Sequence, residues 1–166
     1  MRAMQWFKSV LMGIVLWGAI ALLSFPSPSE AASPDPYVAR YLRATEPIPL
    51  ELNGQGETRL FSPVELSAGK RLFEENCKNC HVGGVTLPNP LVSLSLETLK
   101  GANPPRDTID DLVAFLRQPM TYDGTEEALE CRQVPEAWMS RDQLENLSAF
   151  ILRAAQKTTG WGTERF

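Results

Sequence analysis

The chain has 166 residues, 43% of them hydrophobic, and carries 16 Lys and Arg against 20 Asp and Glu, for a net charge of -4. This length allows one modest hydrophobic core but not two ordinary domains. The acidic balance and the absence of a basic run exclude a nucleic-acid partner, because phosphate binding depends on clustered Lys and Arg.

Residues 1–31 have the pattern of an export signal. Arg2 and Lys8 supply a positive start, an uncharged stretch runs from Val10 to Phe25, and small residues stand at a cleavage position in Ser29-Glu30-Ala31. The uncharged stretch is shorter than the roughly 20 residues of a membrane-spanning helix, although an uncleaved anchor is the alternative. We expect cleavage near the end of this segment and a mature acidic chain that does not span the membrane.

The segment that follows, residues 32–61, is predicted to be an N-terminal extension with a short β-hairpin. Its first part, residues 32–47, is proline-rich and lacks hydrophobic periodicity, so we expect extended or mobile chain there. Apolar residues then alternate from Ile48 to Leu52, a turn follows at Asn53–Gly56, and Thr58–Phe61 leads away. This pattern is typical of a hairpin.

A helix is predicted to begin at Pro63 and to run to about Cys77. The preceding sequence Ser62-Pro63-Val64-Glu65 is a capping box with proline at the first helical position. Leu66, Gly69 and Phe73 share one face of this helix. A glycine between two apolar residues allows a second helix to cross at close range.

Two more helices are expected further along the chain. Asp107 is placed to cap the first, in which apolar residues recur at helical spacing until Pro119, namely Ile109, Leu112, Val113 and Leu116. The second runs from about Arg141 to Ala155, with Leu144, Leu147, Phe150 and Ile151 facing inward. These stripes predict an all-α core around the central motif.

That motif is CKNCHVGG, residues 77–84, which holds two of the three cysteines and the only histidine. The C-x-x-C-H spacing allows Cys77 and Cys80 to form thioethers with the two haem vinyl groups and His81 to bind the iron as proximal ligand. A thioredoxin-like pair would need a βαβ context, and a zinc site would consume every Cys and His in the chain. One covalently bound haem c per chain is therefore predicted, with a disulfide or a partial metal site as the alternatives.

Several segments spread over the chain match one known pattern together: Leu50–Phe61, Gly69–Phe73, Cys77–Gly84, Pro104–Asp107, Pro119, Tyr122–Gly124 and Gly160–Gly162. With the haem motif, they resemble the cytochrome c-550 family, low-potential extrinsic class I cytochromes of photosystem II. The resemblance implies a class I cytochrome c fold over residues 62–166 with covalent haem in the core. It also implies a thylakoid-lumen location, peripheral on the lumenal side of the membrane, and docking on the oxygen-evolving complex.

The chain departs from that family at the sixth iron position. The family has a second histidine a short way after the tyrosine that corresponds to Tyr122, and this chain has none. Cys131 stands at the equivalent place, so the comparison implies a distal thiolate ligand, whose pKa ferric iron and the neighbouring Arg132 would lower. A methionine, chiefly Met139, or an open site are the alternatives.

Two functions follow from the resemblance. The chain is expected to be a low-potential electron-transfer cytochrome whose partner is the lumenal surface of photosystem II or a redox protein. The alternative is a structural extrinsic subunit that stabilises the oxygen-evolving complex without obligatory electron transfer. Homodimerisation stays open. Enzyme activity is not expected, because His81 occupies one side of the iron and catalytic cysteine-ligated haems leave that side free.

Overall fold

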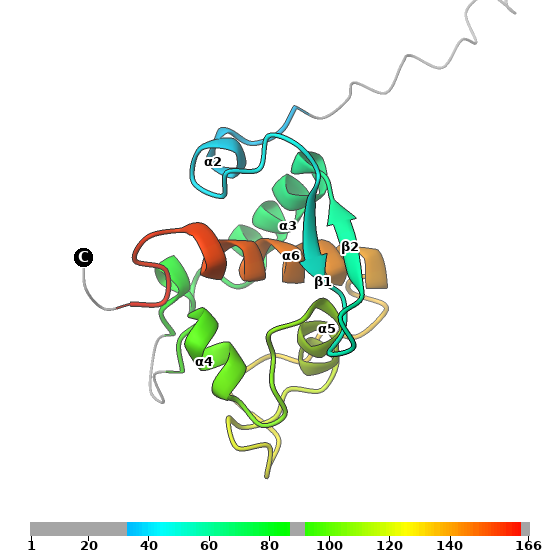
Figure 1. Ribbon diagram of the computed structural model, residues 1–166. Helices are drawn as coiled ribbons and strands as arrows, with labels where there is room; N and C mark the ends of the chain where they lie inside the picture. The colour runs from blue at the N-terminus through cyan, green and yellow to red at the C-terminus, as the bar shows by residue number, and fades with distance from the viewer. Residues whose placement is uncertain (1–32, 87–91, 164–166) are drawn as a thin grey trace, which may run out of the picture. The chain divides into compact units, whose positions relative to one another are not determined.

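The computed structural model describes residues 33–86 and 92–163, and the predicted signal segment therefore lies outside the described residues. The described chain consists of helices, one two-stranded hairpin and irregular connections, of which the longest joins α5 to α6, in agreement with the predicted fold class (Figure 1). Within the described ranges, no helix is long and apolar enough to cross a membrane. The elements are α2 (Pro36–Arg40), β1 (Ile48–Glu51), β2 (Thr58–Phe61), α3 (Pro63–Asn76), the 3-10 turn η1 (Val82–Gly84), α4 (Leu96–Gly101), α5 (Ile109–Arg117) and α6 (Arg141–Lys157).

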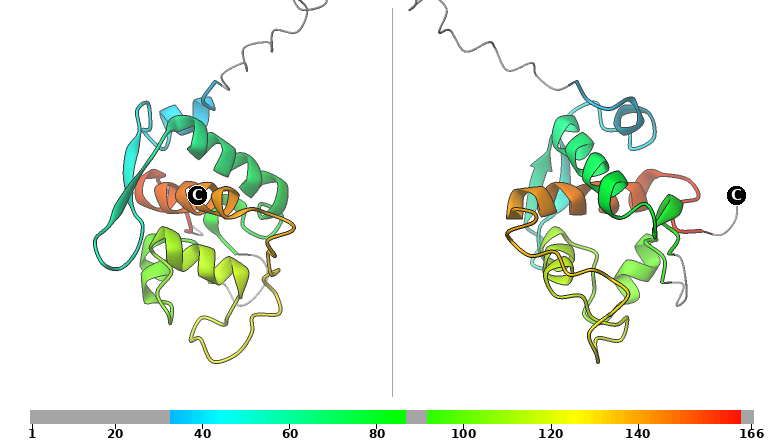
Figure 2. Two further views of the ribbon diagram at one scale, coloured as in Figure 1. Left: turned by 90° about the vertical axis from the view of Figure 1, so that its right-hand side faces the viewer. Right: turned by 180° about the vertical axis from the view of Figure 1, so that it is seen from behind.

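The packing of α3 against α6 is the main helix contact (Figures 1 and 2). It forms at the predicted glycine, Gly69. The capping box at the start of α3 is present, since Glu65 N donates to Ser62 Oγ at 3.2 Å and Ser62 N donates to Glu65 Oε2 at 2.7 Å. Gly69 lies directly against the backbone of α6, where an added Cβ would stand 1.9 Å from the carbonyl oxygen of Asn146. Only glycine allows this approach.

Helix α5 packs on α6 as the apolar stripes predict, but its cap is one residue later than expected. The hydroxyl of Thr108 accepts a hydrogen bond from Asp111 N at 3.3 Å, so Thr108 and not Asp107 is the N-cap. The prediction failed because both residue types suit a cap, and the one adjacent to the first helical residue takes the position. Helix α6 begins at the capping box of Ser140 and Gln143, and the four residues expected to face inward are all buried.

The expectation of extended or mobile chain over residues 32–47 is wrong for Pro36–Arg40, which are helical, and for the buried residues Leu42 and Ala44 that follow. Asp35 caps the short helix α2, with proline at its first position. Val38 and Leu42, one helical turn apart, are 0% exposed, and Arg153 Nε donates to the carbonyl oxygen of Leu42 at 2.8 Å. The prolines favoured an extended chain in the prediction, whereas this buried apolar pair anchors the segment in the core.

The hairpin has the predicted strands, paired antiparallel with Ile48 opposite Phe61 and Leu50 opposite Arg59. Leu50 and Phe61 point into the core and are at most 2% exposed. Arg59 lies on the same face of the hairpin as Leu50 and Phe61, and its guanidinium enters a charged network that the sequence did not predict.

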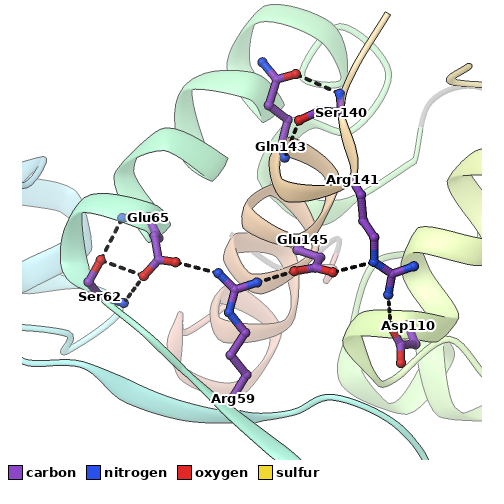
Figure 3. A network of polar contacts seen from close by, with 8 residues as sticks. All are labelled: Arg59, Ser62, Glu65, Asp110, Ser140, Arg141, Gln143 and Glu145. Atoms are coloured by element: carbon purple, nitrogen blue, oxygen red, sulfur yellow. Dashed lines mark hydrogen bonds and ion pairs between the residues drawn. The ribbon is translucent and has the colours of Figure 1, made fainter. Parts of the chain in front are cut away.

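This network joins the hairpin to three helices (Figure 3). Arg59 bridges Glu65 of α3, at 2.7 Å, and Glu145 of α6, while Arg141 joins Glu145, at 2.7 Å, to Asp110 of α5, at 2.6 Å. Glu145 is only 8% exposed, and both of its carboxylate oxygens face a guanidinium. Such pairing is what allows a carboxylate to be buried at all.

Helix α4 was not predicted. Ser95 caps this helix by accepting from Thr98 N at 3.2 Å, and Leu99 is its buried residue. Six residues with one buried apolar side chain show too little periodicity to be recognised from sequence.

We expect Gly69→Ala to lower the free energy of unfolding by about 3 kcal/mol or more, because the new methyl group must push α3 and α6 apart. Urea denaturation of the haem-loaded protein measures this loss. Gly54→Ala is the matched control, since nothing lies within 4 Å of a Cβ at that position. Equal losses for the two variants would show that the crossing is not tightly constrained.

Candidate haem site

The end of α3 folds the cysteine and histidine motif into a compact turn. Cys77 is the C-cap of the helix, and its amide donates to the carbonyl oxygen of Phe73 at 2.8 Å. The amides of Cys80 and His81 both donate back to the carbonyl oxygen of Cys77, at 3.1 and 2.9 Å. The turn therefore holds the two thiols and the imidazole close to one another at the end of a rigid helix.

All three cysteines are free thiols in the structure, so Cys77 and Cys80 are not joined as a disulfide. Cys131, which lies far along the chain, is close enough to both of them for their charges to interact. In the part of the chain that the structure describes, no three His, Cys, Asp or Glu side chains are arranged to hold a metal ion. This arrangement does not fit a zinc site, which needs four converging ligands.

Burial controls the protonation of the motif. It raises the pKa of the Cys77 thiol to about 11, with smaller contributions from Cys131 and Cys80, and it lowers the pKa of His81. At neutral pH the imidazole is therefore neutral, which is the form that binds a metal, and Cys77 is a protonated thiol.

Cys131 lies half-buried beside a buried cation that the sequence analysis did not single out. Burial raises the pKa of the Cys131 thiol, and the Arg106 guanidinium opposes that rise. Arg106 is 8% exposed, stacks on Phe115 at 4.0 Å, and donates through Nη2 to the carbonyl oxygens of Met120 and Thr121 at 3.0 and 2.6 Å. It thus fixes the start of the segment that leads to Cys131 and places a positive charge near it.

Arg132 was expected to lower the pKa of Cys131, but its guanidinium lies over Trp138, 5.4 Å from the ring centroid. The interpretation that Arg132 lowers the pKa of Cys131 is replaced by one in which Arg106 acts. Sequence proximity suggested the wrong arginine, and only the fold brings residue 106 to residue 131.

Met139, the alternative distal ligand, is 2% exposed and belongs to the hydrophobic core. Its carbonyl oxygen accepts from Arg117 Nη2 at 2.9 Å, which ties its backbone to α5. Met139 is therefore a core residue with a fixed backbone, whereas Cys131 lies within electrostatic range of the motif cysteines.

The glycines after His81 serve a close contact with the end of the chain. Gly84 has φ +81°, and a Cβ there would lie 2.6 Å from Cε2 of Trp161. The backbone at Gly84 therefore approaches the Trp161 indole closely. Trp161 is 7% exposed and packs on Phe73 and Phe150.

The residues present fit a covalently attached haem. Two free thiols lie at C-x-x-C spacing beside a neutral imidazole, and a third thiol with a nearby cation comes from a distant segment. A helical fold with this motif at the end of its first long helix defines a class I c-type cytochrome.

The chain belongs to the cytochrome c-550 family, since the family model described as cytochrome c-550 domain matches residues 40–166. The cytochrome c-550-like protein of Thermosynechococcus vestitus is 55% identical over 166 residues, which cover 99% of this chain and 93% of that one. The photosystem II extrinsic protein V of Gloeobacter violaceus is 53% identical over 135 residues, 81% of this chain and 73% of that one. The crystal structure of the PsbV2 cytochrome of Thermosynechococcus elongatus superposes with a TM-score of 0.78 at 62% identity, covering 79% of this chain and all of that one.

Membership of the cytochrome c-550 family establishes the class of activity and the cofactor. The protein is a c-type haem cytochrome of the c-550 type, and proteins of this family transfer electrons and are not enzymes. The predicted fold class and the predicted haem c are thereby confirmed.

We expect Arg106→Met to lower the reduction potential of the haem, because removal of a buried positive charge stabilises Fe(III) relative to Fe(II). A unit charge within electrostatic range is worth on the order of 1 kcal/mol. Arg106→Lys, which keeps the charge but loses the planar fork, should change the potential less. Redox titration of both variants measures the two potentials. If Arg106→Lys lowers the potential as much as Arg106→Met, the charge is not the cause and the prediction fails.

Proposed function

We propose that this protein is a low-potential electron-transfer cytochrome with haem attached through Cys77 and Cys80, and with His81 and Cys131 as axial ligands. The observation that carries the proposal is that the fold brings Cys131 within electrostatic range of Cys77, Cys80 and the buried cation Arg106. The iron, when bound, carries one electron by changing between Fe(III) and Fe(II).

Each residue has a distinct role in this proposal. Cys77 and Cys80 tether the porphyrin at the end of α3, so that the helix crossing fixes its position. His81 presents a neutral imidazole, while Cys131 presents a thiolate. A thiolate donates more charge than imidazole or thioether and so favours Fe(III), which lowers the potential.

The thiolate depends on the metal. Without iron, burial keeps the pKa of the Cys131 thiol above its ordinary value despite Arg106. A coordinated thiol, in contrast, is deprotonated by the metal itself. The free chain therefore holds a thiol, and Cys131 would release its proton to solvent on binding the iron.

We further propose that the protein works in the thylakoid lumen, exported through residues 1–31 and peripheral to the lumenal side of the membrane. Two observations support this: the export pattern of that segment, and the similarity to photosystem II extrinsic protein V of Gloeobacter violaceus. Photosystem II is the proposed partner. A structural role there, without obligatory electron transfer, is the second candidate because the related protein is described as extrinsic.

Cys131→Ser should replace the thiolate by a weaker, neutral donor. We expect the ferric EPR signal of the low-spin thiolate complex to disappear and the potential to rise by on the order of 100 mV, since a charge at the iron is lost. Met139→Leu is the control and should leave the spectrum unchanged. If instead Met139→Leu alters the spectrum and Cys131→Ser does not, the distal ligand is the methionine.

Cell fractionation separates the two candidate functions. Salt-washed photosystem II membranes from the native organism are probed for this chain by its haem stain, alongside the soluble lumenal fraction. Retention on washed membranes, with oxygen evolution lowered when the gene is deleted, favours the structural subunit. Recovery in the soluble fraction, with rapid reduction of its haem by illuminated membranes, favours the electron carrier.

A further inference from the structure

The imidazole of His81 faces a hydroxyl group whose hydrogen already forms a hydrogen bond to another residue. Thr86 Oγ1 lies 3.0 Å from His81 Nδ1, and the same oxygen donates to the carbonyl oxygen of Val92. A hydroxyl has one hydrogen, so with that hydrogen on Val92 the oxygen accepts from the His81 ring. Nδ1 therefore carries the proton of the neutral imidazole, and Nε2 carries the lone pair.

We propose that Thr86 is a positioning residue that fixes the tautomer of His81 and strengthens its donation to the haem iron, and that Trp161 holds this relay in place. The inference rests on the proposed function, in which His81 is the proximal ligand. A ligating histidine whose other ring nitrogen donates a hydrogen bond is a more basic ligand with a fixed orientation.

The direction of the effect follows from the chain of donors. His81 donates to Thr86, and Thr86 donates to Val92, so each hydrogen bond polarises the next. The imidazole gains negative character, which stabilises Fe(III) more than Fe(II) and lowers the potential. The hydroxyl thus acts on the iron without touching it.

The two ends of the relay are anchored to the C-terminal segment. Leu94 N donates to the carbonyl oxygen of Gly84 at 2.7 Å, and Trp161 Nε1 donates to that of Leu94 at 3.0 Å. Gly162 N donates to the carbonyl oxygen of Gly83 at 2.8 Å. Residues on both sides of the Thr86–Val92 contact are therefore bonded to one tail, which fixes the distance between hydroxyl and carbonyl.

The tail is itself held by the helix crossing. The Trp161 ring lies 5.5 Å from that of Phe73 on α3 and 5.9 Å from that of Phe150 on α6. Phe73 is the residue whose carbonyl oxygen accepts from Cys77 N. The same helix end thus supports the motif and, through Trp161, the group that orients its histidine.

The test uses the haem-loaded protein with Thr86→Val, which removes the hydroxyl at nearly constant shape, and Thr86→Ser, which keeps it. Thr158→Val is the matched control, because the Thr158 hydroxyl is buried near the same tail without a hydrogen-bond partner. We expect Thr86→Val to shift the ratio of reduced to oxidised haem about tenfold toward the reduced form, which is 59 mV for one electron. Thr86→Ser should shift it much less, and Thr158→Val should not shift it.

Trp161→Phe tests the anchoring separately, since it keeps the aromatic packing and removes the Nε1 hydrogen bond to Leu94. We expect a smaller shift in the same direction. In the wild-type ferrous protein, proton NMR should show a His81 ring N–H that exchanges slowly with solvent. Rapid exchange of that proton, or equal potentials for Thr86→Val and Thr158→Val, would overturn the proposal, and the NMR measurement applies even where Thr86→Val does not assemble.

The failure of this inference differs from failure of the proposed function. An unchanged potential in Thr86→Val, with haem attached and an intact low-spin ferric spectrum, rejects the relay and leaves the ligation standing. A wild-type spectrum without imidazole ligation rejects the ligation on which the relay depends.

Discussion

The close crossing of α3 and α6 at Gly69 is the constraint on which the rest of the structure depends. The glycine brings the backbone of one helix against the carbonyl oxygen of Asn146 in the other, and this contact fixes where α3 ends. The end of α3 carries Cys77, and the turn that follows carries Cys80 and His81. A chain that separated these helices would still contain the motif but would no longer place it opposite the segment that brings Cys131. The charged network of Arg59, Glu145 and Arg141 ties the hairpin and α5 to the same pair of helices.

Most of the regular structure could be predicted because its signals are local. The capping box at Ser62 predicted the start of α3, and apolar residues at helical spacing predicted the inner faces of α3 and α6. The same logic failed for α2, where prolines obscured the pair Val38 and Leu42, and for α4, which is too short to show a period. The cap of α5 was misplaced by one residue because Asp107 and Thr108 are both good capping residues.

The residues of the haem site also fall into two groups, those that a local pattern predicts and those that only the fold brings into place. The C-x-x-C-H spacing is a local pattern with a specific chemistry, so Cys77, Cys80 and His81 could be named without a structure. Arg106 and Thr86 could not be assigned, since their roles depend on contacts that the fold creates. Arg106 precedes Cys131 by one helix and a loop, and the neighbouring Arg132 looked more suitable in sequence. A pattern search finds ligands, whereas the residues that set the environment of those ligands appear only when distant segments are packed together.

The environment of the iron in this proposal is a balance between opposing charges. The Cys131 thiolate and the His81–Thr86–Val92 relay both supply negative character and favour Fe(III), while the buried guanidinium of Arg106 favours Fe(II). Arg106 also fixes the segment before Cys131 through the carbonyl oxygens of Met120 and Thr121, so its charge cannot move away as the iron changes state. Burial excludes the water that would otherwise screen these interactions, and each therefore acts over a longer range than it would at the surface. Small changes in packing around Trp161 or Phe115 would then alter the potential without changing any ligand.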